Sequence, residues 1–347
     1  MIRFGPAGIP LSCKGRTLKD GIEDVHNMSL TAMEIQLVRV NTFRDYPDED
    51  FIGKTIREID DLMVLEVIRD DELISDPDEP IDEDDELICL NTGIVRSFGE
   101  LTDLGKIAKR LDVGVSLHTP NYIDLGSNND LTEACMNNLR YAGKIVNELQ
   151  GDVVVTSLGL YDGKMDEEEV DMNIVENLDC LLGWWQENNL SPKIGIEITG
   201  QQAVFGNLDQ VLDICDEFRG AVIPVLDFPH YHSRGCGCLV EPADYVNVLE
   251  QVFPYCDGKF YSRFAGVEHD GEGNELRLTP IKKGDLVFEK LADALADMHP
   301  NGTIISSSPL LEHDAMYMRI IYERMVNKRI AKAIRANKKK EAMAADD

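Results

Sequence analysis

Short apolar, β-branched runs alternate along this chain with longer segments whose apolar residues recur every three or four positions. The short runs are typical of parallel strands that are buried on both faces, and the longer periodicity is typical of helices with one apolar face. The predicted strands are residues 2–4, 33–38, 114–117, 153–156, 193–198, 221–226, 259–263 and 303–306. The predicted helices are residues 98–111, 131–150, 167–188, 208–218, 243–252, 286–297 and 311–327.

Eight strand-and-helix units predict an α/β fold whose parallel strands close into a (β/α)8 TIM barrel. A length of 347 residues fits one such barrel with additions. A doubly wound open sheet is the alternative. That fold normally carries a glycine-rich phosphate turn after its first strand, and Gly5-Pro6-Ala7-Gly8 lacks this fingerprint.

One segment after the second strand breaks the alternation. Connections between a strand and the next helix usually span about two to six residues, whereas residues 46–96 lie between the second strand and the helix at 98–111. We therefore expect a barrel made of residues 1–45 and 97–330, with a small α+β insertion at 46–96. Residues 331–347, which are rich in alanine and lysine, should continue the last helix briefly and then form a charged flexible tail.

The insertion resembles a known regulatory module. It contains Gly53-Lys54-Thr55 at a strand start, a Val67-Ile68-Arg69-Asp70 strand, an acidic run at 76–86 and a final Leu87-Ile88 strand. This order resembles the C-terminal module of RCK potassium-uptake proteins. The resemblance implies that the insertion binds small ligands and pairs two chains as a homodimer. A solvated acidic hairpin that decorates the barrel is the alternative, and the sequence leaves both open.

The charge of the chain limits its partners. It has 64 acidic and 34 basic residues and a formal charge of −30, which repels a phosphate backbone unless basic residues gather on one face. DNA is therefore disfavoured as a partner. The acidity fits either life in high internal salt or a surface made for a specific partner.

The chain shows no sign of membrane association. No apolar run approaches the ~20 residues that span a bilayer, and the start Met1-Ile2-Arg3-Phe4-Gly5 lacks the features of a signal peptide. We expect a cytoplasmic protein with no membrane partner. The eight cysteines form no Cys-x-x-Cys pair, and most fit the role of small buried apolar residues in a reducing compartment.

Residues that could carry chemistry follow three of the predicted strands. His118 follows the third strand, Glu197 ends the fifth, and Asp227 and His230 follow the sixth. The carboxyl ends of barrel strands surround one mouth, so these side chains should converge there. Buried carboxylates are costly unless a cation or hydrogen bonds satisfy them, and imidazole with carboxylate suits zinc, manganese or a similar divalent ion.

These segments resemble a known enzyme family. His118-Thr119-Pro120-Asn121-Tyr122-Ile123, Glu197 in Ile-Glu-Ile-Thr-Gly and the run Asp-Phe-Pro-His-Tyr-His-Ser-Arg-Gly at 227–235 resemble the endonuclease IV branch of the xylose isomerase-like superfamily, and the last run is closest to archaeal members. The resemblance implies an AP endonuclease of DNA repair, a hydrolase that uses three metal ions to cut DNA beside abasic sites. It makes His118, Glu197, Asp227 and His230 metal ligands, with Glu197 as the bridging ligand and with Glu197 and Asp227 as catalytic residues.

The sequence also departs from that family. The family has histidines at the positions of Ser157 and Arg263 and near Leu278, and a glutamate at the position of Ser307. We therefore expect fewer than three ions, with zinc the first choice, or none. Arg263 would supply one positive charge where a metal was bound.

His232 is a further candidate ligand. His230-x-His232 is followed by Cys236-Gly237-Cys238, a spacing that can hold a structural zinc, although Cys-x-Cys is a weaker signal than Cys-x-x-Cys. In the alternative, His232 only lines the loop.

Two functions remain open at this stage. The first is an endonuclease IV-like phosphodiesterase that acts on abasic or damaged DNA through a partly degraded metal site. The second is a non-nucleolytic, sugar-isomerase-like barrel that binds a small phosphorylated or sugar ligand and is regulated by the insertion. The register of the family motifs favours the first. The lost ligands and the net charge favour the second.

Overall fold

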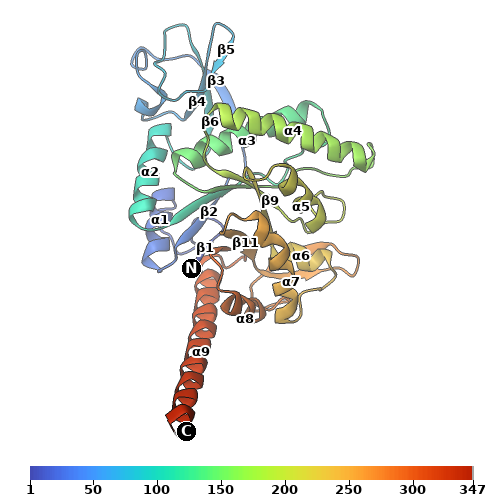
Figure 1. The fold of residues 1–347 in the computed structure, drawn as a ribbon. Coiled ribbons are helices and arrows are strands. Elements are labelled where there is room, and N and C mark those ends of the chain that lie inside the picture. The colour runs from blue at the N-terminus through green and yellow to red at the C-terminus, as the bar shows by residue number, and fades with distance from the viewer. Residues whose placement is uncertain (346–347) are drawn as a thin grey trace.

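The protein is built around a ring of parallel strands, seen in a computed structural model that describes residues 1–345 (Figure 1). The strand order within this described part is β1-β14-β11-β10-β9-β8-β7-β2, and a parallel bridge between Ala7 and Glu34 brings the two ends of the sheet together. The prediction of a (β/α)8 barrel is therefore confirmed. The barrel strands are β1 Ile2–Pro6, β2 Ala32–Gln36, β7 Gly114–His118, β8 Val153–Thr156, β9 Lys193–Glu197, β10 Val222–Asp227, β11 Phe260–Phe264 and β14 Gly302–Ser306.

Helices cover the outside of the ring, each with one buried apolar face. In α2, Ser97 caps the first turn by accepting a hydrogen bond from the Glu100 amide, and Leu101 and Leu104 are buried. Across the described residues, none of these helices is both long and apolar enough to cross a membrane. The helices are α1 Leu18–Asn27, α2 Phe98–Arg110, α3 Asp130–Glu148, α4 Glu167–Glu187, α5 Leu208–Glu217, α6 Phe228–Arg234, α7 Pro242–Val252, α8 Phe288–Met298 and α9 Glu312–Ala345, with 3-10 turns η1 Ile56–Glu58 and η2 Phe253–Tyr255.

The barrel interior is a packed core rather than a channel. Its apolar layer lies below the carboxyl ends of the strands, so polar side chains at those ends stand on a rigid base. This layer is formed by Ala32, Val153, Val155, Ile223, Val225, Tyr261 and Ile305.

Two local elements near the strand ends were not predicted. The helix α6 starts directly after β10, because the Asp227 side chain accepts a hydrogen bond from the His230 amide and Pro229 favours the first helical turn. A hairpin follows β11, formed by β12 Gly266–His269 and β13 Glu275–Thr279. Both elements position side chains at the barrel mouth.

The insertion forms a separate antiparallel sheet. Its strands are β3 Asn41–Asp45, β4 Val64–Arg69, β5 Glu72–Ile74 and β6 Glu86–Asn91, arranged in the order β3-β6-β4-β5. Residues 41–45 were expected to belong to the barrel, but β3 pairs with β6 from Asn41↔Asn91 to Asp45↔Leu87. The insertion therefore begins at Asn41 and not at residue 46. Its likeness to the RCK module stays a prediction.

A buried ion pair joins this insertion to the barrel. Lys144 on α3 donates from Nζ to Glu66 Oε1 and to the Leu65 carbonyl, both at 2.9 Å, and the two charged side chains are only 5% and 4% exposed. The apolar residues of the insertion also belong to the main core cluster. The insertion is therefore packed onto the barrel and does not hang from it.

The carboxyl-terminal segment differs from its prediction. The helix α9 runs to Ala345, through residues 331–345 that were expected to form a flexible tail. Alanine, lysine and arginine are strong helix formers, which accounts for the continuation. Its first turns pack on α8 and β1, and Figure 1 shows the remainder extending away from the barrel.

The buried pair of Lys144 and Glu66 predicts how stability changes when one charge is removed. Glu66→Gln should lower the free energy of unfolding by about 3–5 kcal/mol, because it leaves the Lys144 ammonium buried without a counter-charge. The double variant Glu66→Leu/Lys144→Met should recover most of that loss, because it removes both charges. Urea denaturation measures both values. Equal stability of Glu66→Gln and the wild type would contradict the assigned ion pair.

Candidate active site

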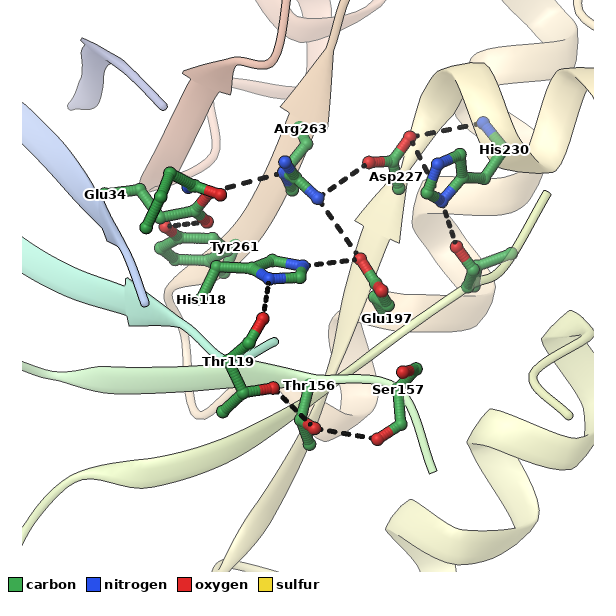
Figure 2. A network of polar contacts seen from close by, with 12 residues as sticks. Glu34, His118, Thr119, Thr156, Ser157, Glu197, Asp227, His230, Tyr261 and Arg263 are labelled. Carbon is green, nitrogen blue, oxygen red and sulfur yellow. Dashed lines mark hydrogen bonds and ion pairs between the residues drawn. The ribbon is translucent and has the colours of Figure 1, made fainter. Parts of the chain in front are cut away.

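The carboxyl ends of four barrel strands carry one connected set of polar side chains (Figure 2). His118 ends β7, Glu197 ends β9, Asp227 ends β10 and Arg263 lies near the end of β11. All four are at least nine-tenths buried, with exposed fractions of 3%, 6%, 0% and 9%. The fold therefore buries ionisable side chains at the carboxyl ends of the barrel strands, directly above the apolar core.

His118 and Glu197 form a direct pair. His118 Nε2 lies 3.0 Å from Glu197 Oε2. The other ring nitrogen, Nδ1, lies 2.7 Å from the Thr119 carbonyl, to which it must donate because a carbonyl oxygen only accepts. This backbone contact fixes the orientation of the ring and leaves Nε2 facing the carboxylate.

Arg263 is the cation at the centre of the set. Its Nη1 donates to Glu197 Oε2 at 3.2 Å and lies 3.5 Å from Asp227 Oδ2, while its Nε lies 3.4 Å from Glu34 Oε1. Figure 2 shows the guanidinium between these three carboxylates. One arginine therefore supplies positive charge to one oxygen of Glu197 and one oxygen of Asp227.

His230 faces the same mouth from α6. Its Nδ1 donates to the Ile198 carbonyl at 2.8 Å, and its Nε2 lies 3.3 Å from Glu275 Oε2. Glu275 belongs to β13, whose backbone is held by hydrogen bonds to the Gly200 carbonyl and from the Gln201 side chain. The hairpin thus places Glu275 next to His230 of α6, which forms a second carboxylate and imidazole pair at the mouth.

Sequence reasoning missed three members of the set, Glu34, Tyr261 and Glu275. Glu34 on β2 is fully buried, and Tyr261 donates to its Oε2 at 2.9 Å. The Tyr261 hydroxyl also contacts Ser116. A glutamate within the apolar run of β2 was a readable signal for Glu34. Glu275 gave no such signal, because it lies in a polar hairpin without strong periodicity.

Other predicted residues lie at the edge of the set or outside it. Among the described residues, Ser157 connects to this set through its backbone carbonyl, which accepts a hydrogen bond from the Thr156 hydroxyl (Figure 2). The Ser307 hydroxyl is buried and has no hydrogen-bond partner among the described residues. Leu278 pairs with Val267 within the hairpin. His232 points away from the mouth, toward Asp285.

The environment moves the pKa values of these groups apart. Burial opposes charge on both His118 and Glu197, but their mutual attraction outweighs it, so the pKa of His118 is raised and that of Glu197 is held below its usual range. Burial likewise opposes charge on His230, yet Asp227 and Glu197 raise its pKa. Burial raises the pKa of Glu275. Glu197 and Glu275 lie at the same mouth, but the pKa of Glu197 is lowered and that of Glu275 is raised.

The donor set fits one divalent ion but not a cluster of ions. Ligand atoms of Glu197, Asp227 and His230 lie within 4.8 Å of one another. Within the described chain, Asp227 Oδ2 and Glu275 Oε2 are buried and accept no hydrogen bond, although Arg263 Nη1 lies 3.5 Å from the first and His230 Nε2 lies 3.3 Å from the second. The Arg263 guanidinium, 3.2 Å from Glu197, repels additional metal ions. These three residues could therefore hold a divalent ion, and the expectation of fewer than three ions stays a prediction.

Comparisons with known proteins agree with this fold. The model of the xylose isomerase-like TIM barrel family matches residues 64–312, and the chain belongs to this family. It is 24% identical over 332 residues to an uncharacterized protein of Methanocaldococcus jannaschii, covering 94% of this chain and 98% of the other.

Two solved structures illustrate the range of proteins with this fold. A D-tagatose 3-epimerase-like protein matches with a TM-score of 0.60 and 16% identity, over 90% of this chain and 96% of its own. Endonuclease IV from Thermus thermophilus matches with a TM-score of 0.54 and 13% identity, over 93% and 99%. At these identities the likeness shows the fold alone. The assignment to the endonuclease IV branch stays a prediction.

The central cation gives one prediction. Arg263→Met should lower the free energy of unfolding by about 3–5 kcal/mol at neutral pH, because three carboxylates lose their buried counter-ion. Lys106→Met removes an exposed lysine paired with Asp103 and serves as the matched control, with a loss below about 1 kcal/mol. Urea denaturation compares the two variants. Equal losses would show that Arg263 is not the charge that holds the mouth together.

The pair of His118 and Glu197 predicts a pH dependence. Because the folded-state pKa of His118 lies above 6.5, its contribution to stability is complete below that pH and is lost as the pH rises through the raised value. The stability difference between the wild type and His118→Gln should therefore shrink as the pH rises above 6.5. Denaturation series with a chelator present would measure it. A difference that grows with pH would contradict the pairing.

Proposed function

We propose that this protein is a sugar-isomerase-like barrel that binds a small, uncharged polyhydroxylated ligand and moves a proton on it. The observation that carries the proposal is the Arg263 guanidinium set between Glu197 and Asp227 at 3.2 and 3.5 Å. A fixed arginine at this position takes the place of metal ions that phosphodiester hydrolysis by this family would require. The nucleolytic function is therefore the weaker of the two hypotheses.

The charge of the mouth favours a neutral ligand. Four carboxylates, Glu34, Glu197, Asp227 and Glu275, outnumber one guanidinium even when His118 and His230 are both protonated. Such a site repels a phosphate group. Carboxylate oxygens accept hydrogen bonds from sugar hydroxyls. A neutral hydroxyl that exchanges a hydrogen bond with water for one with a carboxylate loses little free energy. The formal charge of −30 adds long-range repulsion toward nucleic acid.

The two carboxylate and imidazole pairs suit different roles. Glu197 is held ionised by His118 and Arg263 and would anchor hydroxyl groups. Glu275 has a pKa raised by burial and an unpaired buried Oε2 within the described chain, so it is the better general base. His230 Nε2 lies 3.3 Å away, which places Glu275 beside the ligand atoms of Glu197, Asp227 and His230.

The reaction class follows from these roles. Glu275 would remove a proton from a carbon next to the ligand carbonyl. Arg263 would donate hydrogen bonds to the oxygen on which negative charge develops. A divalent ion bound by Glu197, Asp227 and His230 would supply Lewis-acid polarisation of that oxygen. Protonation of the same carbon from the opposite face gives an epimer. Protonation of the former carbonyl carbon, with the neighbouring hydroxyl proton passing to the former carbonyl oxygen, gives an isomer.

The proposal is tested by hydrogen exchange on the ligand. The protein is incubated in D2O with a panel of unphosphorylated ketoses and aldoses, with and without added Mn²⁺ or Zn²⁺. Proton NMR follows loss of the signal from the carbon next to the carbonyl. We expect exchange with at least one sugar, and Glu275→Gln should slow it by about 10²- to 10⁴-fold because the base is gone.

Controls separate this from the nucleolytic alternative. Glu268→Gln removes a carboxylate of the same hairpin that is paired with Arg277 outside the mouth, and it should leave the exchange rate unchanged. Abasic DNA is incubated with the same preparations. Nicking of abasic DNA together with no exchange on any sugar would reverse the order of the two hypotheses.

A further inference from the structure

A second group of imidazole and carboxylate side chains lies on the other side of α6. His232 Nε2 is 3.2 Å from Asp285 Oδ1, and His269 Nε2 is 3.3 Å from Asp285 Oδ2. Ligand atoms of these three residues lie within 4.8 Å of one another. His230 and His232 share α6 but face opposite sites, so the expected joint zinc site of both histidines does not form.

The ring of His269 presents a lone pair to a carboxylate. Its Nδ1 lies 2.9 Å from the Asp270 carbonyl and must donate to it, because that oxygen only accepts. Unless the ring carries a second proton, Nε2 then holds a lone pair aimed at Asp285 Oδ2. Two electron-rich atoms 3.3 Å apart require positive charge between them. A second proton and a metal ion are the two ways to supply it.

His232 supports Asp285 from within the core. It is 1% exposed, and its Nδ1 accepts a hydrogen bond from the Leu239 amide at 3.1 Å, so its proton is on Nε2. That Nε2 has no well-aligned hydrogen-bond partner in the described residues and is aimed at Asp285 Oδ1. A buried imidazole that faces a carboxylate in this way orients it for a metal, as outer ligands do in metalloproteins.

Two thiols lie on a loop beside the same carboxylate, where Cys236 Sγ faces the Gly271 carbonyl and Cys238 Sγ faces the Tyr231 carbonyl, each at 3.7 Å. The loop Cys236-Gly237-Cys238 passes beside the pair: a side chain carbon at Gly237 would lie 3.6 Å from Asp285 Oδ2 and 3.7 Å from His269 Nε2. Both cysteines are free and exposed. Gly237 has a φ of 88°, which favours glycine and lets the backbone approach this closely. Imidazole, carboxylate and thiolate together form a donor set for zinc or a similar transition metal.

We propose that His269, Asp285 and a thiolate of the Cys236-Gly237-Cys238 loop bind one transition-metal ion, with His232 as the outer residue that orients Asp285. A metal ion competes with a second proton here because an imidazole lone pair faces a carboxylate and the loop that carries both thiols lies beside them. The site would tie the β12–β13 hairpin, the loop after α6 and the segment before α8. It is distinct from the barrel mouth and does not depend on the function proposed for that mouth.

Cobalt substitution tests the site on the full-length protein. The protein is stripped with a chelator and titrated with Co²⁺, and absorption is recorded for a thiolate-to-cobalt charge-transfer band, followed by competition with Zn²⁺. We expect one Co²⁺ per chain with this band. His269→Gln should abolish the band, and Cys236→Ser or Cys238→Ser should do so for whichever thiolate binds. His232→Phe should weaken binding on the order of 10- to 100-fold.

Two variants serve as matched controls. Cys180→Ser removes an exposed thiol on α4 and should leave the band unchanged. Glu197→Gln alters only the barrel mouth and should also leave the band in place, which separates the two sites. Circular dichroism confirms that each variant is folded. Absence of the band in the wild type, or a band that survives both His269→Gln and the double cysteine variant, would overturn the proposal and leave His269 as a protonated partner of Asp285.

Discussion

The barrel mouth depends on one buried guanidinium. Arg263 reaches Glu34 on β2, Glu197 on β9 and Asp227 on β10, so a single side chain from β11 connects three other strands. None of these carboxylates could be buried so deeply without a counter-charge, since desolvating an ion costs several kcal/mol. The same side chain also places a fixed positive charge 3.2 Å from Glu197 and 3.5 Å from Asp227, which opposes the binding of several metal ions at the mouth.

The histidines follow a common arrangement. His118, His230 and His269 each donate from Nδ1 to a backbone carbonyl, of Thr119, Ile198 and Asp270. Each then presents Nε2 to a carboxylate. Backbone carbonyls thus fix the tautomer that either a metal ion or a proton requires.

Two additions give the barrel its individual character. The β12–β13 hairpin brings Glu275 to the mouth, where burial raises its pKa, and Glu275 is the base in the proposed reaction. The insertion from Asn41 to Asn91 is fixed to α3 by the buried contact between Lys144 and Glu66. The insertion is thus held against α3 by a buried ion pair.

Local sequence determined the barrel strands, because a parallel strand buried on both sides must be apolar wherever it lies in the sheet. It also determined that His118, Glu197 and Asp227 stand at strand ends, since strand order alone brings those ends to one mouth. It did not determine the partners of these side chains.

Glu34 and Glu275 are far apart in the chain and join the set only when the barrel closes. Asn41 belongs to the insertion because it pairs with Asn91 of β6. The direction in which His230 and His232 point was decided by α6, whose turn sends two residues that are close in the chain to opposite sites. Such choices depend on tertiary neighbours, which the local pattern of residues does not encode.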